Sequence, residues 1–361
     1  MTLQDFAKPA PADLARRNLL LGALGLSAFS LAGCHKAPAA ADNGSSGVLK
    51  FSIVAPESAS SLEQFWLPII ADMEKSTGLK IVPFFGANYT ALVEAMRFKQ
   101  THFGWFTNLS GLEAVRRSGG EVFARTIDPS GDDGYTSVLI VPAKSKLTLD
   151  DVLKCDKTLN FGIGDAKSTS GTLAPKAFLF SPKGIDVQAC FKTIRPANHG
   201  SNLMGVSNGV LDVATNNSTS LRLQKLRDQE RAAKHEPTIV DKVRVIWTSP
   251  RLPEDPIIWR KDLDPAIKEK LRQFFLTYAQ GDGPEQTRQL GLLSRISIGG
   301  FKPADNNHLL PVREMEASEN LMEAQLSKDP AKIAATEKAL ASIKTEEATL
   351  QAKTGQAPGA Q

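Results

Sequence analysis

Three consecutive hydroxyl residues, Ser168, Thr169 and Ser170, stand where an apolar run ends and a helical pattern begins. Serine and threonine at a helix start can cap the free backbone N–H groups of the first turn. The same N–H groups, with the hydroxyls as extra donors, also form a site for a phosphate-like anion. Taken alone, the triplet favours the plain cap. What faces it decides whether it also binds an anion.

Short β runs alternate with helical patterns around this triplet and along most of the chain from residue 48. This alternation predicts an α/β fold with mostly parallel sheets and helices on both faces. Among the predicted strands are 49–54, 80–85, 103–106 and 135–141, and the helices between them include 62–77, 89–99 and 109–118.

Several polar residues fall on the predicted strand-to-helix turns, where such folds bind their ligands. Tyr89 starts a helix, His199 follows a later strand, and Asp255 precedes a proline in a returning β run. Each of them alone is typical of an ordinary turn. Because they recur at one geometric position, we expect a ligand cleft there. The same position includes Glu57, Ser58, residues 106–108 and residues 212–217.

At 361 residues the chain exceeds one typical domain. We expect it to cross twice between two lobes, near residues 142 and 250, as a clam-shell with two crossover hinges. The predicted parts are a first lobe of 48–142 plus 251–290, a second lobe of 143–250, a C-terminal helical extension of 291–353 and a disordered tail of 354–361.

The N-terminus has the pattern of an export signal. Arg16 and Arg17 precede an apolar run of residues 19–31, which is too short to span a bilayer. The run ends in Leu-Ala-Gly-Cys34, which resembles the lipobox of bacterial lipoproteins. We therefore expect a lipoprotein signal peptide over 1–34, cleaved before Cys34, and a flexible tether over 35–47. The protein would be a lipoprotein of the cell envelope; both general and twin-arginine export remain open.

The remaining cysteines, Cys155 and Cys190, each precede a short β run. If the two runs are neighbouring parallel strands, both cysteines lie at the same sheet edge, and an oxidising compartment favours a disulfide. The alternative is two buried small hydrophobic residues. Neither cysteine has a second ligand at zinc spacing, and the five histidines are scattered, so we expect no metal and no cofactor.

The charge balance excludes one class of partner. The net charge of +4 arises from 43 basic and 39 acidic residues, which predicts no strongly cationic face for nucleic acid.

Four motifs together resemble the phosphonate-binding periplasmic proteins of bacterial ABC importers. The resemblance covers about residues 49–350, and it implies a type II periplasmic binding fold that closes over phosphonates, phosphite or related oxyanions. It also implies delivery to a membrane permease and its ATPase. The motifs are Phe-Gly-Trp-Phe-Thr-Asn-Leu-Ser at 103–110, residues 162–171 with the hydroxyl triplet, Asp-Val-Ala-Thr-Asn-Asn at 212–217 and Asp-Pro-Ile-Ile-Trp-Arg-Lys at 255–261.

In that family the Ser-Thr-Ser triplet binds the phosphonate oxygens, which assigns this role to Ser168, Thr169 and Ser170. The family's binding Tyr, His and Asp match Tyr89, His199 and Asp255. Tyrosine and histidine donate to oxyanion oxygens, whereas an ionised aspartate needs an ammonium or a protonated oxygen.

Two departures from the family pattern bear on the substrate. Phe106 stands where aminoethylphosphonate binders have a second tyrosine, and Thr219 stands where they have a glutamate. The second change removes one of two carboxylates that hold a ligand amine. The sequence therefore predicts an amine-free ligand such as phosphite or methylphosphonate.

Two other functions fit parts of the pattern. A hydrolase triad of Ser168, His199 and Asp255 lacks the Gly-x-Ser-x-Gly elbow, and we expect no enzyme. A sensing subunit of a membrane signalling complex would use the same closed state. In the C-terminal region, apolar residues recur at helical spacing; the resemblance implies a homodimer through these helices, and the alternative is packing on the first lobe.

Overall fold

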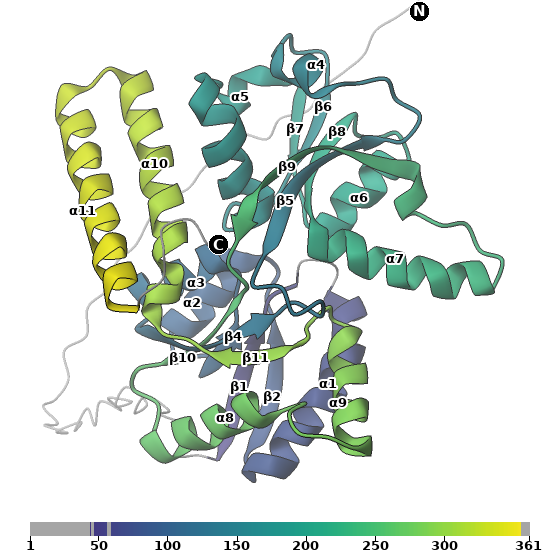
Figure 1. Cartoon of the computed structure of the whole chain (residues 1–361), viewed down its shortest axis with the longest axis vertical. Coiled ribbons are helices and arrows are strands. Elements are labelled where there is room, and N and C mark those ends of the chain that lie inside the picture. The colour runs from purple at the N-terminus through teal and green to yellow at the C-terminus, as the bar shows by residue number, and fades with distance from the viewer. Residues whose placement is uncertain (1–43, 45–46, 56–58, 355–361) are drawn as a thin grey trace, which may run out of the picture. The chain divides into compact units, whose positions relative to one another are not determined.

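The computed structural model describes residues 44, 47–55 and 59–354. The predicted signal peptide with Cys34, most of the tether, Glu57, Ser58 and residues 355–361 lie outside the described residues. In the described ranges the chain forms two β-sheets with flanking helices (Figure 1), and each sheet with its helices is called a lobe below.

The first lobe is built on a six-stranded sheet of β1 Val48–Ile53, β2 Lys80–Phe85, β3 Phe103–Trp105, β4 Gly120–Ile127, β10 Pro256–Arg260 and β11 Gly300–Pro303. The strand order is β11-β4-β10-β3-β1-β2. β1 pairs parallel with β2 and β3. β10 pairs antiparallel with β3 and β4, and β11 antiparallel with β4.

The second lobe is built on a five-stranded sheet of β5 Tyr135–Pro142, β6 Asn160–Ile163, β7 Thr193–Pro196, β8 Val213–Asn217 and β9 Val243–Leu252, in the order β7-β6-β8-β5-β9. β6 pairs parallel with β7 and β8, whereas β5 pairs antiparallel with β8 and β9.

Both sheets are therefore mixed, and the predicted mostly parallel pairing is wrong in this respect. The reason is that helical crossovers are what make neighbouring strands parallel. β5 follows β4, and β10 follows β9, without an intervening helix, and β5 and β10 each lie between two strands that run in the opposite direction. The strand β4 was also absent from the predicted pattern.

The sheets also shift the predicted lobe boundaries. β5 was assigned to the first lobe but pairs within the second sheet, so the first crossing is the segment 128–134 rather than residue 142. The second crossing is 253–255, close to the predicted residue 250. β11, predicted as part of the helical extension, pairs with β4 and belongs to the first sheet.

Helices follow most strands, and their first turns are capped by side chains. Asn88, Thr107, Asn198 and Asn217 each accept a hydrogen bond from an N–H of the helix that follows. In the first lobe the helices are α1 Ala59–Thr77, α2 Tyr89–Arg97, α3 Asn108–Arg117, α8 Pro265–Thr277 and α9 Pro284–Ser294. In the second lobe they are α4 Leu149–Leu153, η1 Thr169–Leu173, η2 Lys176–Phe180, η3 Ser181–Lys183, α5 Val187–Cys190, α6 His199–Ser207, α7 Ser218–Ala233 and η4 Val240–Lys242.

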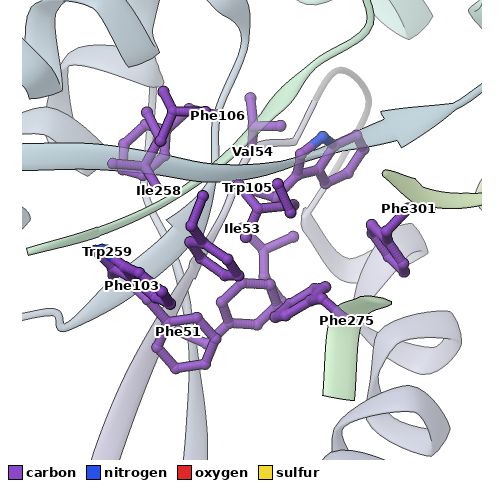
Figure 2. Packing of buried hydrophobic residues seen from close by; sticks show 14 of the residues in the cluster. Phe51, Ile53, Val54, Phe103, Trp105, Phe106, Ile258, Trp259, Phe275 and Phe301 are labelled. Carbon is purple, nitrogen blue, oxygen red and sulfur yellow. The ribbon is translucent and has the colours of Figure 1, made fainter. Parts of the chain in front are cut away.

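An aromatic core fixes the strands of the first lobe. Phe51 stacks on Phe103 at a ring-centroid distance of 4.6 Å, and Phe123 on Trp259 at 3.9 Å. Phe275 of α8 packs edge-on against this group (Figure 2). Because β1, β3, β4 and β10 are locked together by these rings, the turns at their ends have fixed positions.

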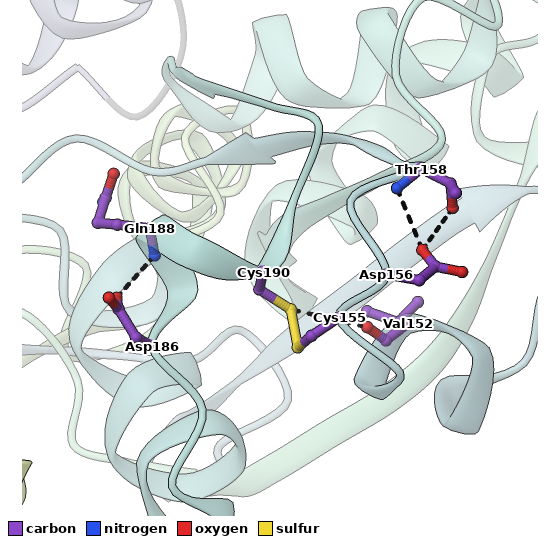
Figure 3. The surroundings of a disulfide bond; sticks show 7 residues. All are labelled: Val152, Cys155, Asp156, Thr158, Asp186, Gln188 and Cys190. Atoms are coloured by element: carbon purple, nitrogen blue, oxygen red, sulfur yellow. Dashed lines mark hydrogen bonds between the residues drawn. A yellow bond between two sulfur atoms is a disulfide. The ribbon is translucent and has the colours of Figure 1, made fainter.

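The second lobe contains the disulfide Cys155–Cys190 (Figure 3). The two cysteines precede β6 and β7, which are parallel neighbours. This confirms the predicted bridge and the sheet-edge argument behind it.

The C-terminal residues form the turn η5 Asn306–Leu309 and the two helices α10 Leu310–Ser327 and α11 Pro330–Thr354, which lie side by side (Figure 1). α10 contacts α3 in the first lobe and η1, η2 and η3 in the second. The hairpin thus packs on both lobes, not on the first alone.

Candidate ligand-binding site

A cavity of about 60 Å³ is lined by residues of both lobes. The polar residues come mainly from the ends of strands and the starts of helices, as expected for an α/β ligand site. They are Tyr89, Thr107, Thr126, Tyr135, Ser170, His199, Asn217, Thr219, Ser220, Glu254, Asp255 and Ser297. The cavity therefore combines the predicted Tyr89, Ser170, His199, Thr219 and Asp255.

The three hydroxyls of the triplet are all buried but have different partners. Ser168 Oγ caps η1 by accepting the Gly171 N–H at 3.0 Å. Thr169 Oγ1 accepts the Leu109 N–H of the first lobe at 2.9 Å. Of the three, Ser170 alone lines the cavity.

Two glycines determine how the triplet turn packs. Gly164 N–H donates to the Gly171 carbonyl at 2.9 Å, and a Cβ on Gly164 would lie 2.5 Å from Gly171 Cα. Any side chain at Gly164 would push the start of η1 away from the end of β6.

Ser170 is the centre of a hydrogen-bond network. Its Oγ accepts from Asn217 Nδ2 at 3.1 Å and lies 3.3 Å from His199 Nε2. The Tyr135 phenol, from the start of β5, also lines the cavity. Burial, and then the nearby Asp255 and Glu254, raise the pKa of Tyr135, so the phenol keeps its proton.

His199 is the first residue of α6 and is buried. Burial lowers the pKa of His199 to about 4, so its ring is neutral at pH 7. A neutral imidazole has one donor and one acceptor nitrogen. Nε2 faces Ser170, and the buried Nδ1 has no hydrogen-bond partner among the described residues.

Two adjacent carboxyl groups, Glu254 and Asp255, belong to the lobe crossing at 253–255 and line the cavity. Asp255 Oδ1 accepts from Asn108 Nδ2 at 3.3 Å, and Glu254 Oε2 accepts from Thr126 Oγ1 at 2.9 Å. Burial raises the pKa of Glu254 to about 7 and the pKa of Asp255 well above its ordinary value, which the Glu254 charge raises further. Both carboxyl groups thus resist ionisation unless a cation approaches.

Phe106 does not line the cavity. It is fully buried in the core of the first lobe (Figure 2), and its neighbour Trp105 lines the cavity instead. Successive side chains of extended backbone point to opposite sides, so Trp105 faces the cavity and Phe106 faces the core.

Sequence reasoning missed Trp105, Tyr135, Asn217 and Glu254 as lining residues. Trp105 and Asn217 lie within the motifs that were singled out, and Glu254 is next to Asp255. Tyr135 gave no local signal, because its position depends on β5 crossing into the second sheet.

Several hydrogen bonds and ion pairs join the lobes around the cavity. Tyr89 N–H donates to Asp165 Oδ2 at 3.2 Å, and Thr107 Oγ1 donates to the Lys167 carbonyl at 2.9 Å. Arg222 of α7 donates to both carboxylate oxygens of Asp128, at 3.1 and 2.5 Å. The structure is therefore a closed state of the two lobes.

None of the described residues that line the cavity is a lysine or arginine. Positive potential there comes instead from the starts of α2, α6 and α7, which bring Tyr89, His199, Thr219 and Ser220 to the cavity. Such a site suits a small anion that is held by neutral donors.

Among the described residues, no group of three or more His, Cys, Asp or Glu side chains has the arrangement of a metal site. None of the helices in the described ranges combines the length and apolar character that crossing a bilayer requires.

Two lobes, two crossings and a cleft cavity with helix N-termini define a type II periplasmic binding protein, a class of transport proteins. Residues 51–309 match the family of periplasmic substrate-binding proteins of phosphonate ABC transporters. The chain belongs to this family, so it is a transport protein of the periplasm and not an enzyme.

The similar proteins agree with this assignment. The chain is 38% identical over 268 residues to the phosphonates-binding periplasmic protein of Escherichia coli K12, covering 74% of this chain and 75% of that one. A binding-protein component of a Pseudomonas aeruginosa phosphonate transporter superposes with a TM-score of 0.77 at 33% identity, over 84% of this chain and 99% of the other. The methylphosphonate complex of a Prochlorococcus marinus protein shares the fold, with a TM-score of 0.62 at 20% identity, over 74% and 97% of the two chains.

Proposed function

We propose that the cavity captures a phosphonate or a related phosphorus oxyanion and that the closed protein delivers it to an ABC permease and its ATPase. The observation that carries this proposal is a set of buried polar atoms around one small cavity. Trp105 Nε1, His199 Nδ1 and Ser220 Oγ are buried, belong to residues that line the cavity, and have no partner among the described residues. Buried polar groups of this kind need a hydrogen-bonding ligand.

The chemistry of the donors fits the oxyanion. With Nε2 accepting from Ser170, His199 Nδ1 carries the proton and can donate to a phosphorus oxygen. Tyr89 brings a phenol hydroxyl to the same cavity, and Ser170 fixes the His199 tautomer. In this proposal Thr169 and Ser168 act indirectly, by joining the lobes and by capping η1. The name of the Escherichia coli relative supports the ligand class.

The cavity size favours a short ligand. A volume of about 60 Å³ holds roughly four to six water-sized groups, which suits a phosphorus oxyanion with a short substituent.

A ligand panel tests this proposal. Phosphite, methylphosphonate, ethylphosphonate and sulfate are added to the purified protein, and the melting temperature is measured; a true ligand raises it with ligand excess over Kd. Ser170→Ala is expected to weaken binding at least about tenfold, because His199 loses the hydrogen bond that keeps its proton on Nδ1, the donor to the charged oxyanion. The matched control is Ser207→Ala, at the last residue of α6 and outside the cavity lining. A panel in which no phosphorus oxyanion raises the melting temperature contradicts the proposal.

The lipid anchor is a second part of the proposal. The resemblance of the segment before Cys34 to a lipobox supports diacylation of Cys34 and attachment to a membrane of the cell envelope. Cys34→Ser is expected to move the protein from the membrane fraction to the soluble periplasmic fraction of the expressing cells. An unchanged distribution would contradict the anchor.

A homodimer through the C-terminal helices is a third part. α11 packs on α10 through Ile343, Leu340 and Leu350, while most of its described residues are exposed. Light scattering after gel filtration is expected to give the mass of two chains. A single-chain mass at all concentrations up to the millimolar range would refute the dimer.

A further inference from the structure

We propose that Glu254 is a specificity-determining residue: with Asp255 it forms a carboxylate pair that binds a cationic group on the ligand, opposite the donors that hold the phosphorus oxyanion. This inference rests on the proposed function. It assigns to Glu254 a role that neither the motifs nor the comparisons give it.

The Glu254 side chain is held in a buried position at the cavity. Glu254 belongs to the second of the two crossings between the lobes, at 253–255. It lines the cavity and is 7% exposed. Its backbone carbonyl lies 2.6 Å from His308 Nε2, and its Oε2 accepts from Thr126 Oγ1 at 2.9 Å. These contacts hold the side chain in place, while the buried Oε1 has no hydrogen-bond partner within the described ranges.

The charged groups around Glu254 and Asp255 bear on which partner this carboxyl pair can bind. The nearby cations are already engaged: Arg222 pairs with Asp128, and Arg125 with Asp133. His308 is neutral near pH 7, because burial lowers its pKa to about 4, and Tyr135 keeps its proton. A carboxylate can only accept hydrogen bonds. A ligand ammonium would ionise the two buried carboxyl groups and donate to the carboxylates that form.

Thr219 lies at the same cavity as this carboxyl pair. This threonine stands where aminoethylphosphonate binders have a glutamate, and the sequence alone therefore predicts an amine-free ligand. In the structure Thr219 lines the cavity from α7 of the second lobe, and Glu254 lines it from the crossing 253–255. Glu254 thus supplies, from the crossing between the lobes, the negative charge that position 219 lacks, and the amine-free hypothesis gives way to a short aminoalkylphosphonate.

Two ligands that differ only in an amine test the inference. Calorimetry on the purified protein at pH 7.5 compares 2-aminoethylphosphonate with ethylphosphonate, which lacks only the amine. We expect the amino ligand to bind at least about tenfold more tightly. In Glu254→Gln we expect this preference to fall below threefold while ethylphosphonate still binds. Glu63→Gln, at an exposed position of α1, is the matched control and keeps the wild-type preference.

A second readout needs no variant. Titrations in buffers of different ionisation heat give the number of protons released. We expect more release with the amino ligand, because the ammonium ionises the Glu254 and Asp255 carboxyl groups.

The failures are distinguishable. If the wild-type protein binds ethylphosphonate as tightly as the amino ligand, or if Glu254→Gln keeps the full preference, the role of Glu254 is refuted while phosphonate capture stands. If neither phosphonate binds to the wild-type protein, the proposed function itself fails.

Discussion

The hydroxyl of Thr169, at the start of η1 in the second lobe, accepts a hydrogen bond of 2.9 Å from the backbone N–H of Leu109 in the first lobe. Both groups are buried. The middle residue of the hydroxyl triplet therefore joins the lobes, while its neighbour Ser170 lines the cavity. Thr169, one position before a residue of the cavity, thus stabilises the contact between the two lobes.

Thr169→Val is expected to weaken ligand binding by about 1 kcal/mol, or roughly fivefold, because the closed state loses one hydrogen bond and leaves the Leu109 N–H unpaired. Calorimetry measures the affinity. The matched control is Thr172→Val, whose hydroxyl bonds the Asp165 carbonyl inside the second lobe. Equal affinity losses in the two variants would show that Thr169 has no special role in closure.

Arg222→Ala should weaken ligand binding by about 1–2 kcal/mol, or roughly tenfold. Its guanidinium joins α7 to the buried Asp128 and also donates to Ser297 Oγ at 3.1 Å. The variant leaves Asp128 buried without this partner in the closed state, and the partial exposure of Arg222 reduces the effect. Small-angle scattering of the free protein should show a larger share of the open state. Arg195→Ala, at an exposed position of β7, is the control, and an equal response there would contradict the prediction.

Reduction of Cys155–Cys190 is expected to lower the free energy of unfolding by about 3–4 kcal/mol, because the bridge closes a loop with a sequence separation of 35. Urea unfolding with and without reductant measures the change. Neither cysteine lines the cavity, so ligand affinity at low denaturant should stay the same. A large loss of affinity with unchanged stability is the opposite outcome and would place the bridge in the binding mechanism.

The stability of Glu254→Gln relative to the wild-type protein should depend on pH. Burial raises the pKa of Glu254 from 4.5 to about 7, so the folded protein binds a proton that the unfolded chain has lost. The wild-type protein therefore loses stability as the pH rises from about 4.5 to 7, by up to about 3 kcal/mol, and the glutamine variant avoids this loss.

The two buried histidines, His199 and His308, act in the opposite sense but are present in both proteins, so their contributions cancel. Unfolding by urea at pH 4.5, 6 and 8 gives the difference between the two proteins. A difference that stays constant across this range would mean that Glu254 titrates normally in the fold.

The sequence by itself determined the local and repetitive features. Strand and helix periodicity, the helix start at Ser168 and the placement of Cys155 and Cys190 before neighbouring strands depend on residues close in the chain. Four motifs in order were enough for the family and its two-lobed fold. These features follow from backbone caps and side-chain period, which operate over a few residues.

Only the tertiary structure decided which side chains meet. It places Phe106 in the core and Trp105 at the cavity. The Thr169 hydroxyl bonds the Leu109 N–H and does not line the cavity. Glu254 and Thr219 line the same cavity. The tertiary structure also turns β5 and β9 antiparallel to their neighbours. The physical reason is that these outcomes depend on how the lobes close and on which sheet each crossing strand joins, and contacts between distant segments leave no periodic trace in the chain.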